Sequence, residues 1–258
     1  MNQNLDTNPD TSPDTNPTLS MARIRAIVRK EMRDYRRNRF VVSTMVVMPL
    51  LFTVLPIVEI FSFSATTAKI DTRIGLYLLY LLLIPALMPA AIAAYAVVGE
   101  REQGTLEPVL TTPVRREEIL IGKALAAFVP TVAIAYTMFG IFLACVGLFA
   151  NQYVADAIFT SAHLLPQLLF TPLLAGWSIW AGIAISTRSN DVRVAQQLGT
   201  LASLPPVAVT ALMGFGVIRP TLALALCLGA ALLLIDVLAW KLVSTMFDGE
   251  RLVTGSKA

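Results

Sequence analysis

The sequence predicts an all-α, polytopic membrane protein with six transmembrane helices, and three observations lead to this fold class. Of the 258 residues, 56% are hydrophobic and 14% are charged, whereas a soluble domain is about half apolar and about a quarter charged. The mean hydropathy is +0.69. Apolar runs long enough to cross a bilayer recur along the chain, and Lys and Arg are concentrated in alternate segments between these runs.

Residues 1–21 are expected to form a disordered, low-complexity tail. They repeat a short theme of Asp, Thr, Asn or Ser, and Pro, and a segment of low hydrophobicity with frequent proline does not form a packed core. The tail lacks the basic start and apolar centre of a signal peptide. Met21 is a second candidate start of translation. Residues 22–258 are expected to form one transmembrane domain.

An interfacial amphipathic helix is predicted just before the first span. Ile24, Ile27, Val28, Met32 and Tyr35 recur at helical spacing, and bases fill the rest of the segment. We expect the apolar side to lie in the lipid headgroups and the bases to face anionic lipid. A solvated basic arm is the alternative. The bases assigned to the lipid contact are Arg29, Lys30, Arg33, Arg36, Arg37 and Arg39.

The six predicted spans cover residues 40–63, 74–98, 124–150, 164–185, 198–218 and 221–243. In the second span, Ala86, Ala90 and Ala94 recur at four-residue spacing, and such a stripe of small residues permits close contact between helices. Pro205 and Pro206 interrupt the fifth span.

The distribution of basic residues predicts the orientation. Of the 20 Lys and Arg residues, only Lys69, Arg73 and Arg219 fall in the loops on one side of the predicted membrane. Since cytoplasmic loops carry the excess of bases, we expect a multi-pass protein of the cell (inner) membrane with both termini in the cytoplasm. The net charge of +3 does not indicate a nucleic-acid partner, because the bases lie next to spans.

Residues 99–123, GEREQGTLEPVLTTPVRREEILIGK, form the only long polar-rich segment between two long apolar runs. A segment with so many charges must lie in water at one membrane face. Gly104 and Thr105 provide a turn and a helix cap, and Glu107 falls in the first turn that follows. Thr112 and Pro113 then predict the start of a second helix. We expect a hairpin of two short cytoplasmic helices that is accessible to a partner protein.

No catalytic or metal-binding constellation is recognisable in the sequence. His163 is the only histidine, and Cys145 and Cys227 both lie in apolar runs. The phosphate-binding GxxxxGK[ST] loop is absent, so we expect any nucleotide energy to come from a partner. We therefore expect a non-enzymatic chain that binds no metal or cofactor. Asp236 is the one candidate functional residue within a span, and pairing or snorkelling near the inner face is the alternative reading.

The polar segment resembles the signature of ABC-2-type transporter permeases, and Arg29–Arg39 is similar to the helix that precedes their first span. In the signature, an acidic start and a Gly-Thr-Leu-Glu run are followed by a helix led by proline and by Gly-Lys at the next span. The matching positions are Glu100, Glu102, Gly104, Thr105, Leu106, Glu107, Pro113, Ile119, Leu120, Gly122 and Lys123.

The resemblance implies the transmembrane domain of an ABC exporter. Two such domains, identical or different, would pair, and each would dock on a separate ATPase subunit that binds ATP and Mg. The polar segment would be the coupling element. Its implied coupling residues are Glu100, Glu102, Gly104, Thr105, Leu106, Glu107, Pro113, Arg115, Arg116 and Lys123.

The cargo and the energy source are left open by the residues themselves. Spans rich in Leu, Ala, Val and Met favour an amphipathic or lipid-like cargo over a hydrophilic one. A secondary transporter or channel that is not driven by ATP is the main alternative, and it would require ion-binding groups within the membrane or interrupted helices in matched halves. A membrane-embedded enzyme and a membrane anchor for a cytoplasmic complex are weaker alternatives.

Overall fold

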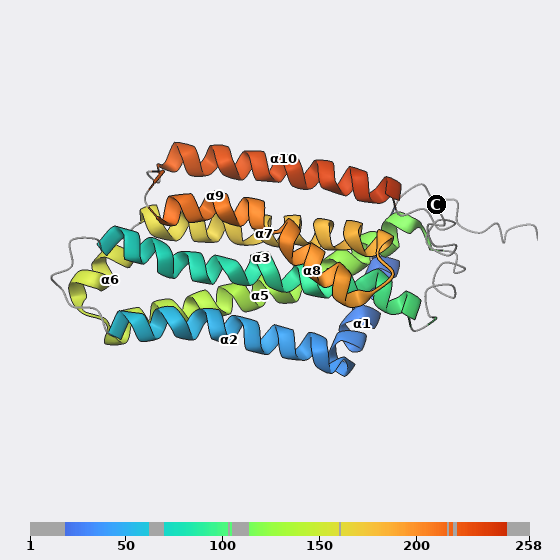
Figure 1. The fold of residues 1–258 in the computed structure, drawn as a ribbon, viewed down its shortest axis with the longest axis horizontal. Coiled ribbons are helices and arrows are strands. Elements are labelled where there is room, and N and C mark those ends of the chain that lie inside the picture. The colour runs from blue at the N-terminus through green and yellow to red at the C-terminus, as the bar shows by residue number, and fades with distance from the viewer. Residues whose placement is uncertain are drawn as a thin grey trace, which may run out of the picture.

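The computed structural model describes residues 19–61, 70–102, 104, 114–159, 161–215, 217–218 and 221–246, and every regular element in these ranges is a helix. The helices form an elongated bundle and most of them lie along its long axis (Figure 1). We call the end that holds α1 the α1 end and the opposite end the α6 end. The helices are α1 (Met21–Arg37), α2 (Arg39–Phe61), α3 (Ile70–Glu102), α5 (Arg116–Phe149), α6 (Gln152–Ile158), α7 (Ser161–Arg188), α8 (Val192–Ala202), α9 (Leu204–Gly214) and α10 (Leu222–Met246).

Within the described ranges, five helices are long and apolar enough to cross a membrane. Their apolar stretches are Arg39–Phe61, Thr72–Glu100, Arg116–Phe149, Leu164–Arg188 and Leu222–Met246. The all-helical fold and the multi-pass class are thereby confirmed. Helices α3 and α5 both continue past the predicted spans at the α1 end, so the polar segment between them is shorter than the sequence suggested.

The predicted fifth span is two helices rather than one. Helices α8 and α9 have 11 residues each and meet at Ser203. At about 1.5 Å per residue each is about 16 Å long, which is too short to cross a bilayer alone. Pro205 and Pro206 lie in the first turn of α9, where a missing backbone N–H leaves no helical hydrogen bond unmade. The prolines therefore start a helix instead of kinking one.

Helix α6 occupies residues expected to be a loop. It is only seven residues long and follows α5 directly. Val154 and Ile158 are buried against Phe142 and Val146 of α5, in the apolar cluster that closes the α6 end of the bundle. The segment is helical because these two side chains, one turn apart, face the same cluster.

The predicted alanine stripe lies at the contact between α3 and α7. Ala86, Ala90 and Ala94 are fully buried. The Ser178 hydroxyl donates to the carbonyl oxygen of Ala86, and the Ser186 hydroxyl donates to that of Ala94 at 2.6 Å. The two pairs have the same sequence offset, so α3 and α7 run parallel. Small residues at four-residue spacing on both helices let the backbones approach closely, as expected for a membrane protein.

A third helix joins this contact at its centre. A Cβ added to Gly182 of α7 would lie 2.9 Å from the Cβ of Ala93 and 3.0 Å from the carbonyl oxygen of Ala90. A Cβ added to Gly199 of α8 would lie 3.5 Å from the same carbonyl oxygen. The two glycines therefore allow α7 and α8 to pack together on α3, which lies at the centre of the bundle (Figure 1).

The outer faces of the bundle are strongly apolar. On α10, Leu233, Leu234 and Leu238 have exposed fractions of 54%, 61% and 54%. On α2, Val46 and Leu50 are similarly exposed. Leucine and valine spread over whole helix lengths suit contact with lipid chains or another membrane subunit, because hydrocarbon, unlike water, imposes no cost on them.

Candidate functional site

Helix α1 packs against the start of α5. Its Ile24 and Tyr35 are buried, and a Cβ added to Gly122 of α5 would lie 2.5 Å from Ile27 Cγ2. This placement differs from the expected one, in which the apolar side lies in the headgroups. Ile119, in the first turn of α5, belongs to the apolar cluster that Tyr35 and Ile27 of α1 also join, so this turn offers a protein surface for α1 to cover.

Four charged residues from three helices form a cluster at the α1 end: Lys30, Glu31, Glu100 and Lys123. The Lys123 ammonium lies 2.9 Å from Glu31 Oε1 and 2.8 Å from Glu100 Oε2, and this residue is only 1% exposed. Lys30 Nζ lies 3.2 Å from Glu31 Oε1 and also contacts Glu100 Oε1. We call this set the charge cluster. The two positive charges of the bases balance the two negative charges of the acids, and a buried ion needs such a compensating charge nearby.

The charge cluster joins the two helices that flank the polar segment. Glu100 lies near the end of α3, Lys123 lies in the second turn of α5, and Lys30 and Glu31 both lie on α1. Breaking a buried ion pair by removing one partner costs about 3–5 kcal/mol, because the other charge is left uncompensated. The middle of α1, the end of α3 and the start of α5 are therefore held together as one unit.

The carboxylates control two neighbouring pKa values. Burial opposes the charge on Lys30, but the adjacent carboxylates of Glu31 and Glu100 outweigh it and hold the pKa of that ammonium well above its ordinary value. Burial raises the pKa of the Tyr35 phenol, and the charges of Glu31, Glu100 and Asp34 raise it further. Lys30 thus stays charged and Tyr35 stays neutral over the physiological range.

A second carboxylate fixes the start of α5. Glu118 is fully buried and accepts hydrogen bonds from the backbone N–H of Ser20, at 2.7 Å, and of Arg115, at 3.2 Å. Arg23 of α1 lies 3.7 Å from the same carboxylate. The predicted helix start at residue 113 is wrong, because Arg115 is still extended and α5 begins at Arg116. The carboxylate caps the first turn from inside the helix.

Two further predicted positions lie in the described part of the polar segment. Glu102 is exposed, and its Oε1 accepts from the backbone N–H of Val192, at 3.3 Å, at the start of α8. Gly104 is exposed with a φ of +67°, the left-handed conformation that the predicted turn requires. Asp191 caps α8 by accepting from Arg193 N at 2.6 Å. The end of α3 is therefore connected to α8 as well as to α1.

The other predicted positions are either exposed or not described. Arg115 and Arg116 are exposed beside the start of α5. Thr105, Leu106, Glu107 and Pro113 lie outside the described residues, as do residues 1–18, so the first helix of the expected hairpin and most of the expected tail stay predictions. The segment predicted as the second helix of the hairpin forms the start of α5, which continues without a break into the span.

The bases of the predicted lipid contact separate into two groups. Lys30 is exposed as well but pairs with acids of the charge cluster, whereas the arginines lie on α1 or at the start of α2 outside this cluster. Sequence reasoning missed Glu31. This acid falls at the spacing of the apolar positions, one turn before Tyr35 and two turns after Ile24, and an acid at such a position is a signal for a buried partner. The exposed arginines of the predicted lipid contact are Arg29, Arg33, Arg36, Arg37 and Arg39.

Asp236 lies at the contact between α10 and α7. It is 9% exposed, and a Cβ added to Gly176 would lie 2.8 Å from its Oδ2. Within the described residues, its Oδ1 has no hydrogen-bond partner. Lys241 is exposed, and no ion pair joins it to Asp236. The carboxylate therefore does not pair with the base that its sequence neighbourhood offers.

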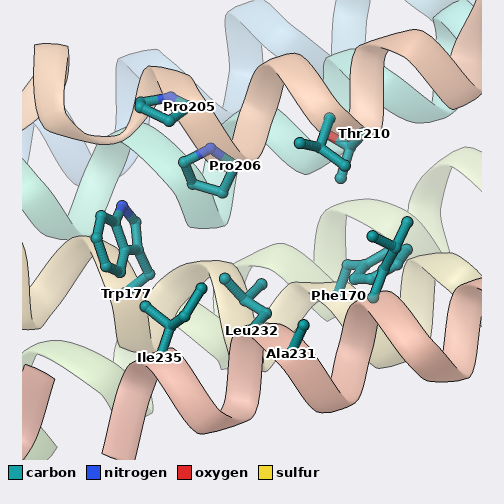
Figure 2. Close-up of a pocket in the computed structure, with 10 residues that line it drawn as sticks. Phe170, Trp177, Pro205, Pro206, Thr210, Ala231, Leu232 and Ile235 are labelled. Atoms are coloured by element: carbon teal, nitrogen blue, oxygen red, sulfur yellow. The ribbon is translucent and has the colours of Figure 1, made fainter. Parts of the chain in front are cut away.

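A cavity of about 250 Å³ lies between α7, α9 and α10. Figure 2 shows Trp177, Pro206 and Leu232, one from each helix, pointing into this space. Its other walls include Phe170, Thr210 and Ile235. Nearly all of these side chains are apolar, as in most small-molecule sites.

Metal chemistry finds no support in the part of the chain that the structure describes. No group of three or more His, Cys, Asp or Glu side chains converges there, and Cys145 and Cys227 are free thiols. His163 lies in the first turn of α7. The charge cluster is a set of ion pairs between helices, and its Lys30, Glu31 and Lys123 border a cavity of about 230 Å³.

Comparison with known proteins identifies the class of protein. The model of a family described as ABC-2 family transporter protein matches residues 25–247, which run from α1 to the end of α10. No curated protein matches the chain. The family match covers most of α1 and all of the other described helices, and it agrees with the apolar outer surface of the bundle. The chain therefore belongs to the ABC-2 transporter family and is a multi-pass membrane permease.

Proposed function

We propose that the chain is the permease subunit of an ATP-binding-cassette exporter in the cell membrane. It moves an amphipathic or lipid-like substrate out of the cytoplasm, with ATP hydrolysed on a separate ATPase subunit. Two permease chains, identical or different, pair and each docks on one ATPase. Membership of the ABC-2 family supports this proposal, and so does the absence of a phosphate-binding loop from the sequence.

The α1 end is the cytoplasmic end in this proposal. Support comes from the bases, since the exposed arginines of α1 lie along a helix at this end, and Arg115, Arg116, Arg188 and Arg193 lie at helix ends there. Helix α1 begins and helix α10 ends at this same end (Figure 1). Both termini of the described chain therefore face the cytoplasm.

The proposal counts six crossings, with α8 and α9 together as the fifth. Helix α7 finishes at the α1 end and α10 starts at the α6 end (Figure 1), so the chain between them must traverse the bundle. Two helices of 11 residues give about 33 Å at 1.5 Å per residue, which matches a hydrocarbon core of about 30 Å. A broken span is acceptable in lipid where its freed polar groups are satisfied.

The charge cluster is the observation that supports a role of the polar segment in coupling. It ties α3, which enters the polar segment, to α5, which leaves it, and it ties both to α1. A force applied by an ATPase to the polar segment is thereby passed to two spans at once. Glu100 and Lys123 act inside the permease, and the exposed Glu102, Arg115 and Arg116 are left to contact the ATPase.

Charge reversal at an exposed position tests this proposal. The variant Glu102→Lys, purified with its ATPase and placed in vesicles, should keep assembly of the permease but lose at least about tenfold of transport-coupled ATP hydrolysis. The control is Asp156→Lys, at an exposed acid on α6 at the far end of the bundle. Equal coupling in both variants would argue against docking at the α1 end, and a permease that never associates with an ATPase would overturn the exporter role.

A secondary transporter is the second candidate, because two observations favour it. Asp236 is an intramembrane acid without an ion-pair partner in the described structure, and the break between α8 and α9 resembles the interrupted helices of such transporters. Uptake or efflux by the permease alone in vesicles, driven by a proton gradient and indifferent to ATP, would decide for this candidate.

A further inference from the structure

The cavity between α7, α9 and α10 opens toward the side of the bundle. Two of its lining residues, Val209 of α9 and Ile235 of α10, are 38% and 41% exposed, whereas Phe170 of α7 is 3% exposed. Helix α9 packs mainly on α3, and α10 packs mainly on α7, so the two helices leave a space between them. A compound dissolved in the membrane can therefore enter the cavity without passing through the centre of the bundle.

The cavity lies far from both ends of the membrane-spanning helix α10. Its lining on α10 runs from Leu228 to Ile235, whereas the helix runs from Leu222 to Met246. At about 1.5 Å per residue, Leu228 is about 9 Å from the first residue of the helix and Ile235 is about 16 Å from the last. A polar group that stays at a membrane face is therefore out of reach of the cavity, and a ligand inside it must be apolar.

The polar side chains in the cavity wall already have partners within the protein. Trp177 Nε1 donates to the carbonyl oxygen of Ala202 at 2.9 Å, and Thr210 Oγ1 donates to that of Val207 at 2.8 Å. The Ala202 carbonyl needs this donor, because the residue four positions later is Pro206, which has no N–H. The other lining side chains are apolar, so the wall offers no hydrogen bond or charge to a ligand.

The same contacts fix the shape of the cavity. The hydrogen bond to Ala202 holds the Trp177 ring in place, and the rings of Pro205 and Pro206 restrict the backbone at the start of α9. Figure 2 shows Trp177 and Pro206 on the walls of this space. Because these walls are rigid, the cavity selects a ligand by its shape.

Selection by shape favours a rigid ligand over the chain of a lipid. Lipid chains are as apolar as leucine, so an apolar compound gains little from the hydrophobic effect when it leaves them for the cavity. The gain comes from dispersion contacts with fixed walls, which a void would forfeit. A flexible chain that makes these contacts loses rotational freedom, whereas a ring system has none to lose.

The size of the ligand follows from the volume of the cavity. An engineered cavity of about 150 Å³ with similar apolar walls binds benzene, so about 250 Å³ suits a ring system of about ten carbon atoms. We propose that this cavity binds an uncharged, rigid ring hydrocarbon of about this size from the membrane, in contact with Trp177, Pro206 and Leu232. The bound ring lies between α9 and α10.

This inference goes beyond the proposed function and does not depend on it. Binding to the purified chain requires neither ATP nor an ATPase subunit, and the ligand need not be a cargo. A failure of ATPase coupling with normal ring binding would therefore count against the exporter role alone. Normal coupling without ring binding would count against the site alone.

The test follows the quenching of tryptophan fluorescence by bromine, which acts at contact distance, in the full chain held in phosphatidylcholine nanodiscs. The variant Trp180→Phe/Trp240→Phe leaves Trp177 as the only indole. The rigid probe is 1-bromoadamantane, and 1-bromodecane is the flexible control with equal numbers of carbon and bromine atoms. Empty nanodiscs give the partition of each probe into lipid.

We expect 1-bromoadamantane to quench Trp177 in a saturable way. Its half-saturation should fall at a mole fraction in lipid at least about fivefold lower than that of 1-bromodecane, because only the chain loses rotational freedom. If the double variant does not fold, the unchanged protein is compared with Trp177→Phe, and the quenching that this substitution removes is the signal of Trp177.

Three further variants separate the cavity from the lipid-facing surface. Ala231→Phe and Val209→Phe place a ring in the cavity from two different walls, and each should abolish the saturable quenching. Leu234→Phe adds a ring to the outer side of α10, where the leucine is 61% exposed, and should leave the quenching unchanged. Circular dichroism and gel filtration verify the fold, and Val209→Phe decides alone if Ala231→Phe does not fold.

Three results would overturn the proposal. The first is saturable quenching that persists in the folded cavity-filling variants, which would place the binding elsewhere. The second is a half-saturation for 1-bromodecane equal to or lower than that for 1-bromoadamantane, which would assign the cavity to lipid chains. The third is no saturable quenching by either probe, as expected if a second permease chain covers the cavity.

Discussion

The Lys123 ammonium lies 2.8 Å from Glu100 Oε2, so that the two ends of the polar segment between α3 and α5 are clamped together inside the protein. Lys123 is 1% exposed, and Glu31 of α1 completes its surroundings at 2.9 Å. A buried ion pair fixes the positions of the helices that carry it, because separating the pair would leave a buried charge uncompensated. An exposed pair at the same distance would contribute little to stability. These ion pairs therefore hold the end of α3 and the start of α5 together and join both to α1.

The first prediction concerns the stability of this clamp. Lys123→Met should lower the free energy of unfolding by about 3–5 kcal/mol, because Glu31 and Glu100 are left buried with one base between them. Thermal unfolding in detergent, followed by circular dichroism, measures the effect. The control is Arg29→Gln, at an exposed position on α1, which should change stability by less than about 0.5 kcal/mol. Equal losses in the two variants would contradict a special role for the buried pair.

The second prediction concerns the crossing of α3, α7 and α8. Gly182→Ala should destabilise the protein by about 1–3 kcal/mol, since the new Cβ would lie 2.9 Å from the Cβ of Ala93 and 3.0 Å from a carbonyl oxygen. Gly140→Ala is the matched control, because nothing lies within 4 Å of an added Cβ there. The control should be neutral or stabilising by about 0.5–1 kcal/mol through helix propensity alone. A neutral Gly182→Ala would show that the helices are not in close contact.

The third prediction concerns the hydroxyl groups between α3 and α7. Ser186→Ala removes a donor to the carbonyl oxygen of Ala94 at 2.6 Å and an acceptor for Val98 N at 3.1 Å, and should cost about 1–2 kcal/mol. Thr137→Ala is the control, since its exposed hydroxyl bonds only to its own helix at Ala133 O. The same unfolding assay compares them. A loss in the control as large as that in Ser186→Ala would rule out an interhelical role.

The fourth prediction concerns alkaline pH. The pKa of Lys30 is raised above its ordinary 10.5 in the folded protein, so its stabilising charge is fully present below that pH and is lost as the pH rises toward the folded value. The pKa of Tyr35 is raised above 10.0, so unfolding increasingly releases its proton above that pH. The unfolding temperature should be steady from about pH 7 to pH 9 and fall beyond about pH 10.

The control for the alkaline effect is the variant Tyr35→Phe, which keeps the ring and removes the proton. It should lose less stability between about pH 9 and pH 11 than the unchanged protein does. An identical pH profile in the two proteins would assign the alkaline loss to other groups. Because the Tyr35 hydroxyl has no hydrogen-bond partner in the described structure, the substitution leaves no group newly unpaired.

Features that depend on neighbours along the chain were predictable. The apolar runs predicted α2, α3, α5, α7 and α10, because hydrophobicity over a window of about 20 residues is a local property. The alanine stripe predicted a close helix contact, and Ala86, Ala90 and Ala94 are fully buried in one. Gly104 predicted a turn and has a positive φ.

Features that depend on a partner distant in the chain were not predictable. Glu100 and Lys123 were expected to face an ATPase, and they are instead paired in the interior with Lys30 and Glu31. The start of α5 was placed too early, at Thr112 and Pro113, because the sequence does not show that the Glu118 carboxylate caps the helix from Arg115. In both cases the sequence shows charges without showing which of them meet.

By itself, the sequence determined that this protein is a bundle of membrane-spanning helices with a polar segment between two of them, and that its bases gather on one side. These properties follow from the composition of each short stretch, since a helix forms and partitions into lipid through its own residues. Only the tertiary structure decided that the charges near that segment are mutual partners, that the predicted fifth span is two helices meeting at Ser203, and that Asp236 packs against Gly176. Those outcomes depend on which helix faces lie together, and the packing of small residues on α3, α7 and α8 determines those faces.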